Sequence, residues 1–261
     1  MAKGTRHSRD ELRELILETG RTMLKEEGLS SGAAALTFKR VFARVDEDTG
    51  VRLTNASVIH RVWDSQSDFQ TDLLVTVAQG QCDAEIDAAE HAVIPIVASI
   101  DLTTLDSREQ ALRDLCRLAG QLNTQTVHES VNWPLIIGIW AQTATGERTV
   151  SRKKIEAALL SAFDGFTARI EANYGAMATF IGLRLREQLT LLDFVIAADS
   201  LSEGYGLRDR LDDMPKRVVV RPTGPDGEPQ EWTIFAVALQ GLIHQFFEFD
   251  PDWTPPKRKA S

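Results

Sequence analysis

Apolar residues recur at helical spacing along most of this 261-residue chain, and this pattern constrains its fold more than any other feature. Between Leu12 and Met23 they lie three or four residues apart, which is the spacing of the inner face of an amphipathic helix. Ser8 precedes this run where a helix cap is expected, and Gly28 follows it where helices commonly end. The pattern therefore predicts a helix at about residues 9–27.

The same periodicity predicts helices along the rest of the chain, each bounded by polar, proline or glycine residues. They are expected at about residues 38–45, 54–63, 67–89, 107–126, 131–144, 149–174, 176–186, 188–209 and 232–248. Residues 211–231 are rich in proline and glycine, which predicts a loop, and Arg217–Arg221 within it fits a short strand. The predicted fold class is therefore all-α.

The composition is that of a folded globular protein. Apolar residues make up 43% of the chain and charged residues 26%, which argues against disorder. Cys82 and Cys116 are too few for a disulfide framework, so both are expected to be reduced thiols. The polar, basic start Met1–Arg9 lacks the apolar stretch of a secretory leader, and no apolar run is long enough to span a membrane. We therefore expect a cytoplasmic protein.

Patterns that carry catalysis or metal binding are missing from the sequence. It contains no Gly-x-Ser-x-Gly, no P-loop, no dinucleotide-binding glycine motif and no His-Glu-x-x-His. His91, His128 and His244 have only single carboxylates nearby in sequence, which is a weak pattern for a metal site. We expect no catalytic residues, no cofactor and no metal ion.

Residues 37–63 hold two short predicted helices joined by a turn that contains Gly50. With the helix before them they can bury one small core, which is the helix-turn-helix arrangement whose second helix enters the major groove of DNA. Val58 and Val62 give that second helix an apolar face, and Thr54 at its start leaves amide groups for a phosphate. Its remaining surface carries side chains whose donors and acceptors suit base edges: Asn55, Ser57, His60 and Arg61.

About 60 N-terminal residues resemble the tetracycline-repressor (TetR) family of bacterial transcriptional regulators. The first predicted helix ends in the family's Glu-x-Gly pattern within Glu26–Leu29. His60 and Trp63 fall where the family has Tyr-x-x-Phe, and Gln66 and Phe69 fall where it has Lys-x-x-Leu. The helix pair, the resemblance and the local charge together nominate these DNA-binding residues: Thr37, Lys39, Arg40, Thr54, Asn55, Ser57, His60, Arg61 and Gln66.

The resemblance implies two domains. Residues 1–75 would form the three-helix helix-turn-helix domain, and residues 76–261 a larger helical domain that binds an effector and makes a homodimer. A two-fold dimer implies a palindromic operator in double-stranded DNA. The implied function is a ligand-responsive repressor that a small-molecule effector releases from DNA, with the predicted helix 67–89 as the lever between the two domains.

The predicted effector and dimer residues lie in the C-terminal helices, where Leu201–Leu207 is also similar to a stretch of the family's dimer helices. Aromatic residues on packed helices are mainly core, and a minority are expected to line an apolar pocket. The pocket candidates are Trp133, Trp140, Phe163, Phe166, Tyr174 and Phe180. The dimer interface candidates, at the spacing that helix packing needs, are Leu189, Leu192, Val195, Ile196, Leu239, Leu242, Ile243 and Phe246.

The charge is unevenly distributed. The formal net charge of −9 argues against a sequence-blind nucleic-acid binder. Residues 1–75 carry only −1 of it, and residues 36–63 carry five basic and three acidic residues, a net +2. Basic residues near the N-terminus, Lys3, Arg6 and Arg9, form an arm that either reaches DNA or stays solvated.

Two alternatives to DNA-binding regulation stay open. The turn before the second helix is longer than the family's and carries the acidic run Asp46–Asp48, and Gln66 brings no charge where the family has lysine. These departures favour a degenerate relative that binds a partner or ligand without DNA. The other alternative is a helical-bundle enzyme of unknown reaction, which an apolar pocket lined by paired carboxylates of shifted pKa would favour.

Overall fold

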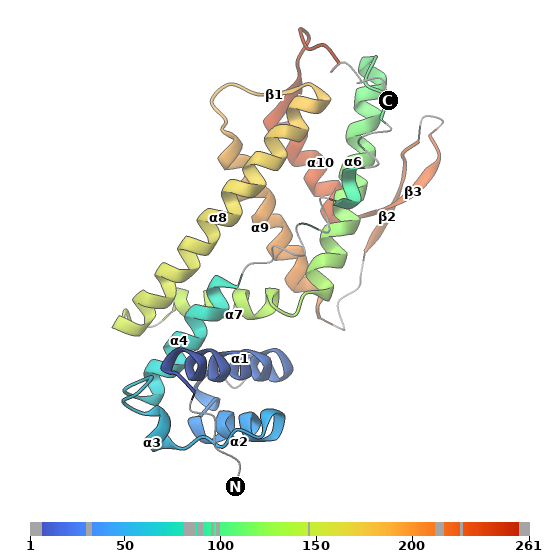
Figure 1. Cartoon of the computed structure of the whole chain (residues 1–261). Helices are drawn as coiled ribbons and strands as arrows, with labels where there is room; N and C mark the ends of the chain where they lie inside the picture. The colour runs from blue at the N-terminus through green and yellow to red at the C-terminus, as the bar shows by residue number, and fades with distance from the viewer. Residues whose placement is uncertain are drawn as a thin grey trace. The chain divides into compact units, whose positions relative to one another are not determined.

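The computed structural model describes residues 7–29, 33–80, 87, 91–94, 97, 100–145, 147–211, 217–224 and 227–255 (Figure 1). These residues are predominantly helical, which confirms the predicted all-α class. The helices are α1 (Arg9–Glu27), the 3-10 turn η1 (Ala33–Ala35), α2 (Phe38–Thr49), α3 (Asn55–Val58), α4 (Gln66–Gln79), α6 (Leu105–Glu129), α7 (Trp133–Ala144), α8 (Val150–Ile181), α9 (Leu191–Asp209) and α10 (Ile234–Phe246). No helix in this part of the chain is both long and apolar enough to cross a membrane.

Two antiparallel strand pairs accompany the helices. β1 (Leu183–Leu185) pairs with β4 (Phe247–Phe249), and β2 (Val218–Pro222) pairs with β3 (Pro229–Thr233). The loop predicted for residues 211–231 is therefore largely a hairpin, and the short strand expected within it is present as β2. Residues 212–216 and 225–226 lie outside the described residues.

Several predicted helix bounds were wrong. The helices expected at 149–174 and 176–186 form the single helix α8, and β1 takes the place of the second one's end. The helix expected at 67–89 ends as α4 at Gln79, where Gly80 follows in an extended conformation. The rest of that predicted lever falls partly outside the described residues, as does Cys82.

The chain divides into two compact units. Unit 1 comprises residues 1–82 and 131–164, and unit 2 comprises residues 83–130 and 165–261. The predicted division at residue 75 did not foresee that the segment 131–164, with α7 and the first half of α8, belongs to the N-terminal unit.

Unit 1 forms around one hydrophobic core. Side chains of α1, α2, α3 and α4 fill its centre, and those with 0% exposure are Ile16, Val41, Val45, Val58, Phe69 and Leu73. Residues of α7 and the first half of α8, such as Leu135, Ile139 and Leu159, belong to the same core. The predicted cap of α1 is present, since Ser8 accepts the Glu11 amide, and at α2 Thr37 accepts the Arg40 amide in the same way.

The core of unit 2 brings α6, α9 and α10 together. Phe194 and Val195 of α9 pack with Phe235 and Leu239 of α10, and each side chain is at most 5% exposed. Gly120 of α6 lies so close to α10 that a side chain there would overlap α10. The close crossing of α6 and α10 therefore depends on a residue without a side chain.

A buried arginine closes one end of unit 2. The guanidinium of Arg108 (α6) donates to the carbonyls of Ile181 and Gly182, where α8 ends. The same group lies over the Phe249 ring at 4.9 Å and over the Trp253 ring at 4.5 Å. Gly182 has a φ of 76°, in the left-handed region, and a Cβ atom there would overlap both Arg108 and Trp253. This clasp joins α6, the end of α8 and the segment after β4.

We predict that Gly182→Ala destabilises unit 2 by roughly 1–3 kcal/mol, because alanine disfavours this φ and collides with the clasp. Urea unfolding followed by circular dichroism measures the loss. Gly227→Ala is the matched control, since Gly227 has a φ of 71° but nothing within 4 Å of the added Cβ. Equal losses in the two variants would show that the clasp contributes nothing beyond the backbone penalty.

Candidate nucleic-acid interface

The first helix of the predicted pair is longer than the expected 38–45, because the acidic run Asp46–Asp48, which was expected in the following turn, belongs to the helix. α2 runs from its cap at Thr37 to Gly50, which has a φ of 72° and ends the helix in the left-handed conformation. Its buried residues are Phe38, Val41, Phe42 and Val45, which are the predicted apolar positions. α2 is thereby fixed against α1 and α4 in the unit 1 core.

The second helix is much shorter than predicted. α3 is helical only over Asn55–Val58, whereas the periodicity predicts a helix over 54–63. His60 has a φ of 62°, and its amide donates to the Trp63 carbonyl at 2.8 Å, so the chain turns after α3. In a continuous helix Val58 and Trp63 would lie about 140° apart around the axis. The turn lets both side chains enter one core, at 0% and 6% exposure.

Trp63 anchors this turn. Its ring centroid lies 6.2 Å from that of Phe38 and 5.1 Å from that of Phe69, which joins the turn to α2 and α4. Its Nε1–H donates to Asp72 at 2.9 Å, and Asp72 also accepts two hydrogen bonds from Arg13 of α1 at 3.0 Å each. The indole is therefore held by both its apolar body and its polar edge.

The polar residues of this segment face solvent. Thr54 and Asn55 are exposed, and the His60 side chain is 81% exposed and lies 3.6 Å from the Asp64 carboxylate. Arg61 is exposed, and its Nη2 donates to the carbonyl of His7 at 2.7 Å. The Ser57 side chain lies outside the described residues, as do Lys3 and Arg6 of the predicted arm. The structure thus presents four of the nine nominated residues, Thr54, Asn55, His60 and Arg61, on one short, anchored segment.

Gln66 has an internal partner instead of a free surface position. Its Oε1 accepts the amide of Phe38 at 3.2 Å, so Gln66 of α4 helps Thr37 to satisfy the N-terminus of α2. The amide of a helix N-terminus is the kind of donor that binds phosphate. Gln66 therefore occupies one donor of the site at which the resemblance expects a phosphate contact.

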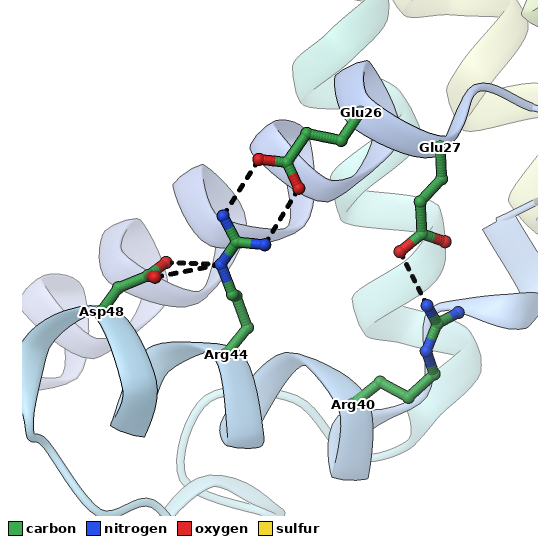
Figure 2. A network of polar contacts seen from close by, with 5 residues as sticks. All are labelled: Glu26, Glu27, Arg40, Arg44 and Asp48. Carbon is green, nitrogen blue, oxygen red and sulfur yellow. Dashed lines mark hydrogen bonds and ion pairs between the residues drawn. The ribbon is translucent and has the colours of Figure 1, made fainter.

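The basic residues of α2 pair with acidic neighbours, as Figure 2 shows. Arg40 contacts Glu27 of α1 at 2.7 Å, and Arg44 contacts Glu26 of α1 at 2.9 Å and Asp48 at 2.8 Å. Hydrogen bonds first to Glu26 and then to Asp48 raise the pKa of Arg44.

These pairs remove the positive patch that the sequence predicts. Arg52 pairs with Asp46 at 3.5 Å, and Lys39 is exposed. Adding Glu26 and Glu27 to the acidic residues of 36–63 makes them equal in number to the five basic ones. The two glutamates were missed because they belong to α1, although their place in its last turn is a signal of proximity to α2.

An open groove of about 670 Å³ lies beside this site within unit 1. Val62, Trp63 and Asp64 of the turn line one part of it. Asp68 and Asp72 of α4 and Lys154 of α8 add charged side chains to its walls. The groove therefore adjoins the same turn that presents His60 and Arg61.

The aromatic residues predicted to form one effector pocket belong to different units. Trp133, Trp140 and Phe163 are in unit 1, where the rings of Trp140 and Phe163 lie 5.7 Å apart. Phe166, Tyr174 and Phe180 are in unit 2, where Tyr174 contacts Phe194 edge-on at 4.9 Å. The structure does not bring the six together within a single unit.

The predicted dimer residues separate into buried and exposed groups. Val195 and Leu239 are each 1% exposed and belong to the protomer's own core, so the prediction that they face a partner was wrong. Leu192 and Ile196 are 44% and 45% exposed on α9, and Leu207 of the same helix is 48% exposed. The remaining candidates are half-buried: Leu189, Leu242, Ile243 and Phe246.

Two carboxylates of α9 were not nominated from the sequence. Burial, and then the neighbouring Glu203 carboxylate, raise the pKa of Asp199 to about 7, and burial raises the pKa of Glu203. Two acids four residues apart, within a helix predicted to pack, are the signal that was available. Neither residue lines the groove in unit 1. Cys116 of unit 2 is buried, and burial raises its pKa to about 12, so its thiol is protonated at neutral pH.

Comparison with known proteins adds no relative. No family model matches the chain, and no curated protein matches it in sequence. The resemblance to the TetR family therefore rests on the residues quoted above, and the geometry of the two units is the remaining basis for a proposal about the protein's function.

Protonation of Asp199 predicts a pH dependence of stability. The folded state keeps a proton that an unfolded aspartate loses near its ordinary pKa, so stability is greatest below that value and falls as pH rises to about 7. Asp199→Asn mimics the protonated form and should lose less thermal stability between about pH 5 and about pH 8 than the wild type. The exposed Asp252 provides the control, Asp252→Asn. Identical pH profiles for wild type and Asp199→Asn would contradict this assignment.

Proposed function

We propose that this protein is a DNA-binding transcriptional regulator whose unit 1 reads duplex DNA through the segment Thr54–Arg61. One observation carries the proposal. Val58, Val62 and Trp63 are buried in the unit 1 core, while Asn55, His60 and Arg61 of the same segment remain exposed. A groove reader needs this combination of an anchored apolar side and a free polar side.

The exposed side chains suit the chemistry of the major groove. An asparagine amide can pair with adenine, and an arginine guanidinium can pair with guanine. The guanidinium of Arg61 donates to the backbone carbonyl of His7. Because this carbonyl is uncharged, a base edge can replace it as the partner of Arg61 without leaving an acidic group unpaired. Lys39, exposed on α2, is a candidate for a phosphate.

The paired arginines make base contacts more important than phosphate contacts. Nonspecific affinity for DNA depends on cations that neutralise phosphates, and Arg40 and Arg44 are engaged with Glu27, Glu26 and Asp48. We therefore expect weak binding to random DNA and a clear preference for particular sequences.

Unit 2 is proposed to carry the effector site and the homodimer contact. The exposed apolar residues Leu192, Ile196 and Leu207 on α9 give a second copy of the chain a surface to bury. A two-fold pair of reading segments fits a palindromic operator. A small-molecule effector that favours one arrangement would control DNA affinity, with a coupling of about 1–3 kcal/mol. A cytoplasmic location suits this role.

A second candidate is a protein that binds a partner or ligand without DNA. The ion pairs in Figure 2 favour it, because they cancel the positive charge that DNA binding uses. The groove beside Trp63, about 670 Å³ in volume, is within the size range of small-molecule sites. Asp199 and Glu203 have raised pKa values, but neither lines this groove, so they give a helical enzyme no support from it.

The principal test is Arg61→Ala. Against duplexes selected by the wild type from a random-sequence library, we expect a loss of about 1–3 kcal/mol in binding free energy, since one base contact is removed. Fluorescence anisotropy measures it. Arg148→Ala is the matched control, because Arg148 is an exposed arginine of unit 1 outside the reading segment. Unchanged affinity in Arg61→Ala, or failure of the wild type to select any duplex, would overturn the assignment.

The ion pairs allow a separate prediction that distinguishes the two candidates. The double variant Glu26→Gln with Asp48→Asn releases Arg44 and should steepen the salt dependence of DNA binding by about one counterion, a slope change near −0.9. Glu156→Gln, which releases Arg148 in the same unit, is the control. An equal change in both variants would show that α2 does not lie near the phosphates.

A further inference from the structure

Helix α8 is anchored in two different hydrophobic cores. Figure 1 shows it as one unbroken ribbon from Val150 to Ile181, a length of 32 residues. In its first half, Ile155, Ala158 and Leu159 are buried in the core of unit 1. In its second half, Ile170 and Tyr174 pack against the core around Phe194 in unit 2. The helix therefore belongs to both units.

Between these anchors lies a stretch that neither core holds. Among the residues that the structure describes, no member of 164–169 belongs to the hydrophobic cores of either unit. The boundary between the units falls between Asp164 and Gly165, both exposed. Glycine is the least favourable residue in a helix interior apart from proline, and sharp bends in helices concentrate at such positions. α8 contains two glycines; Gly175 packs against Leu191 of unit 2, whereas Gly165 lies exposed at the boundary.

Thr167 supplies a second, independent observation. Its hydroxyl is buried and has no hydrogen-bond partner in the described structure. Other helical threonines of this chain donate to the carbonyl four residues earlier, as Thr19, Thr71 and Thr179 do at 2.8–2.9 Å. An unpartnered buried hydroxyl destabilises the state that contains it, and local opening would give it water as a partner. The intact helix is therefore destabilised at the same stretch that contains Gly165.

We propose that residues 164–169 are a hinge at which α8 opens or bends while both of its ends stay packed. Among the described residues, opening at this stretch breaks no contact of the hydrophobic cores, and although it exposes the Thr167 side chain, which is 7% exposed in the intact helix, it gives the Thr167 hydroxyl water as a partner. The use of the hinge in regulation, as the route by which a ligand in unit 2 alters DNA reading in unit 1, rests on the proposed function.

Amide hydrogen exchange of the DNA-free protein tests the hinge directly. We expect amides of residues 165–169 to exchange about tenfold faster than those of 156–160 and 174–178. Gly165→Ala should slow the exchange of this stretch about fivefold, because alanine favours the helix. Thr167→Val, which removes the unpartnered hydroxyl at similar volume, should slow it as well.

Gly204→Ala is the matched control, since Gly204 lies exposed within α9 and an added Cβ meets nothing within 4 Å. It should leave exchange in α8 unchanged. Uniform protection along α8, or equal effects of Gly165→Ala and Gly204→Ala on residues 165–169, would overturn the hinge. Because no DNA is present, these outcomes are independent of whether Arg61 contacts DNA.

Discussion

The candidate reading segment depends on the placement of one indole ring. Trp63 packs against Phe38 and Phe69 and donates to Asp72, and Asp72 is held in turn by Arg13. Four elements of unit 1 therefore meet at this side chain: α1, α2, α4 and the turn after α3. The left-handed backbone at His60 follows from the same constraint, because the chain must turn for Trp63 to reach the core. Exposure of the polar side chains next to it is a consequence of that burial.

The charge of unit 1 shows why composition alone misleads about nucleic-acid binding. A count along residues 36–63 finds an excess of basic residues, but the partners of Arg40 and Arg44 include Glu26 and Glu27 at the end of α1. Exposed ion pairs of this kind contribute little to stability, yet each engages a cation that would otherwise attract phosphate. In the proposed DNA reader, the pairs between α2 and α1 would therefore lower the affinity of unit 1 for DNA of arbitrary sequence.

The sequence predicted those features that depend on neighbours along the chain. The cap at Ser8 and the helix end at Gly28 are local, because each partner lies within four residues. The end of α3, the hydrogen bond of Gln66 and the pairing of Arg44 with Glu26 involve residues distant in sequence, so periodicity gives no sign of them. Likewise, apolar spacing on α9 does not distinguish Val195, which faces its own core, from Leu192, which faces solvent.

Because unit 1 attracts phosphate only weakly, the proposed mechanism needs another source of affinity for DNA. A single unit 1 with one short reading segment has few contacts from which to gain affinity. Two such segments linked in a dimer bind far more tightly than one, because the second binds at a high effective concentration once the first is in place. That gain is lost when the spacing of the segments no longer matches the two half-sites. A DNA-binding protein whose arginines are neutralised by ion pairs therefore depends more on the geometry of its dimer than a strongly basic protein does. In such a protein, a small reorientation of unit 1 would suffice to release the DNA.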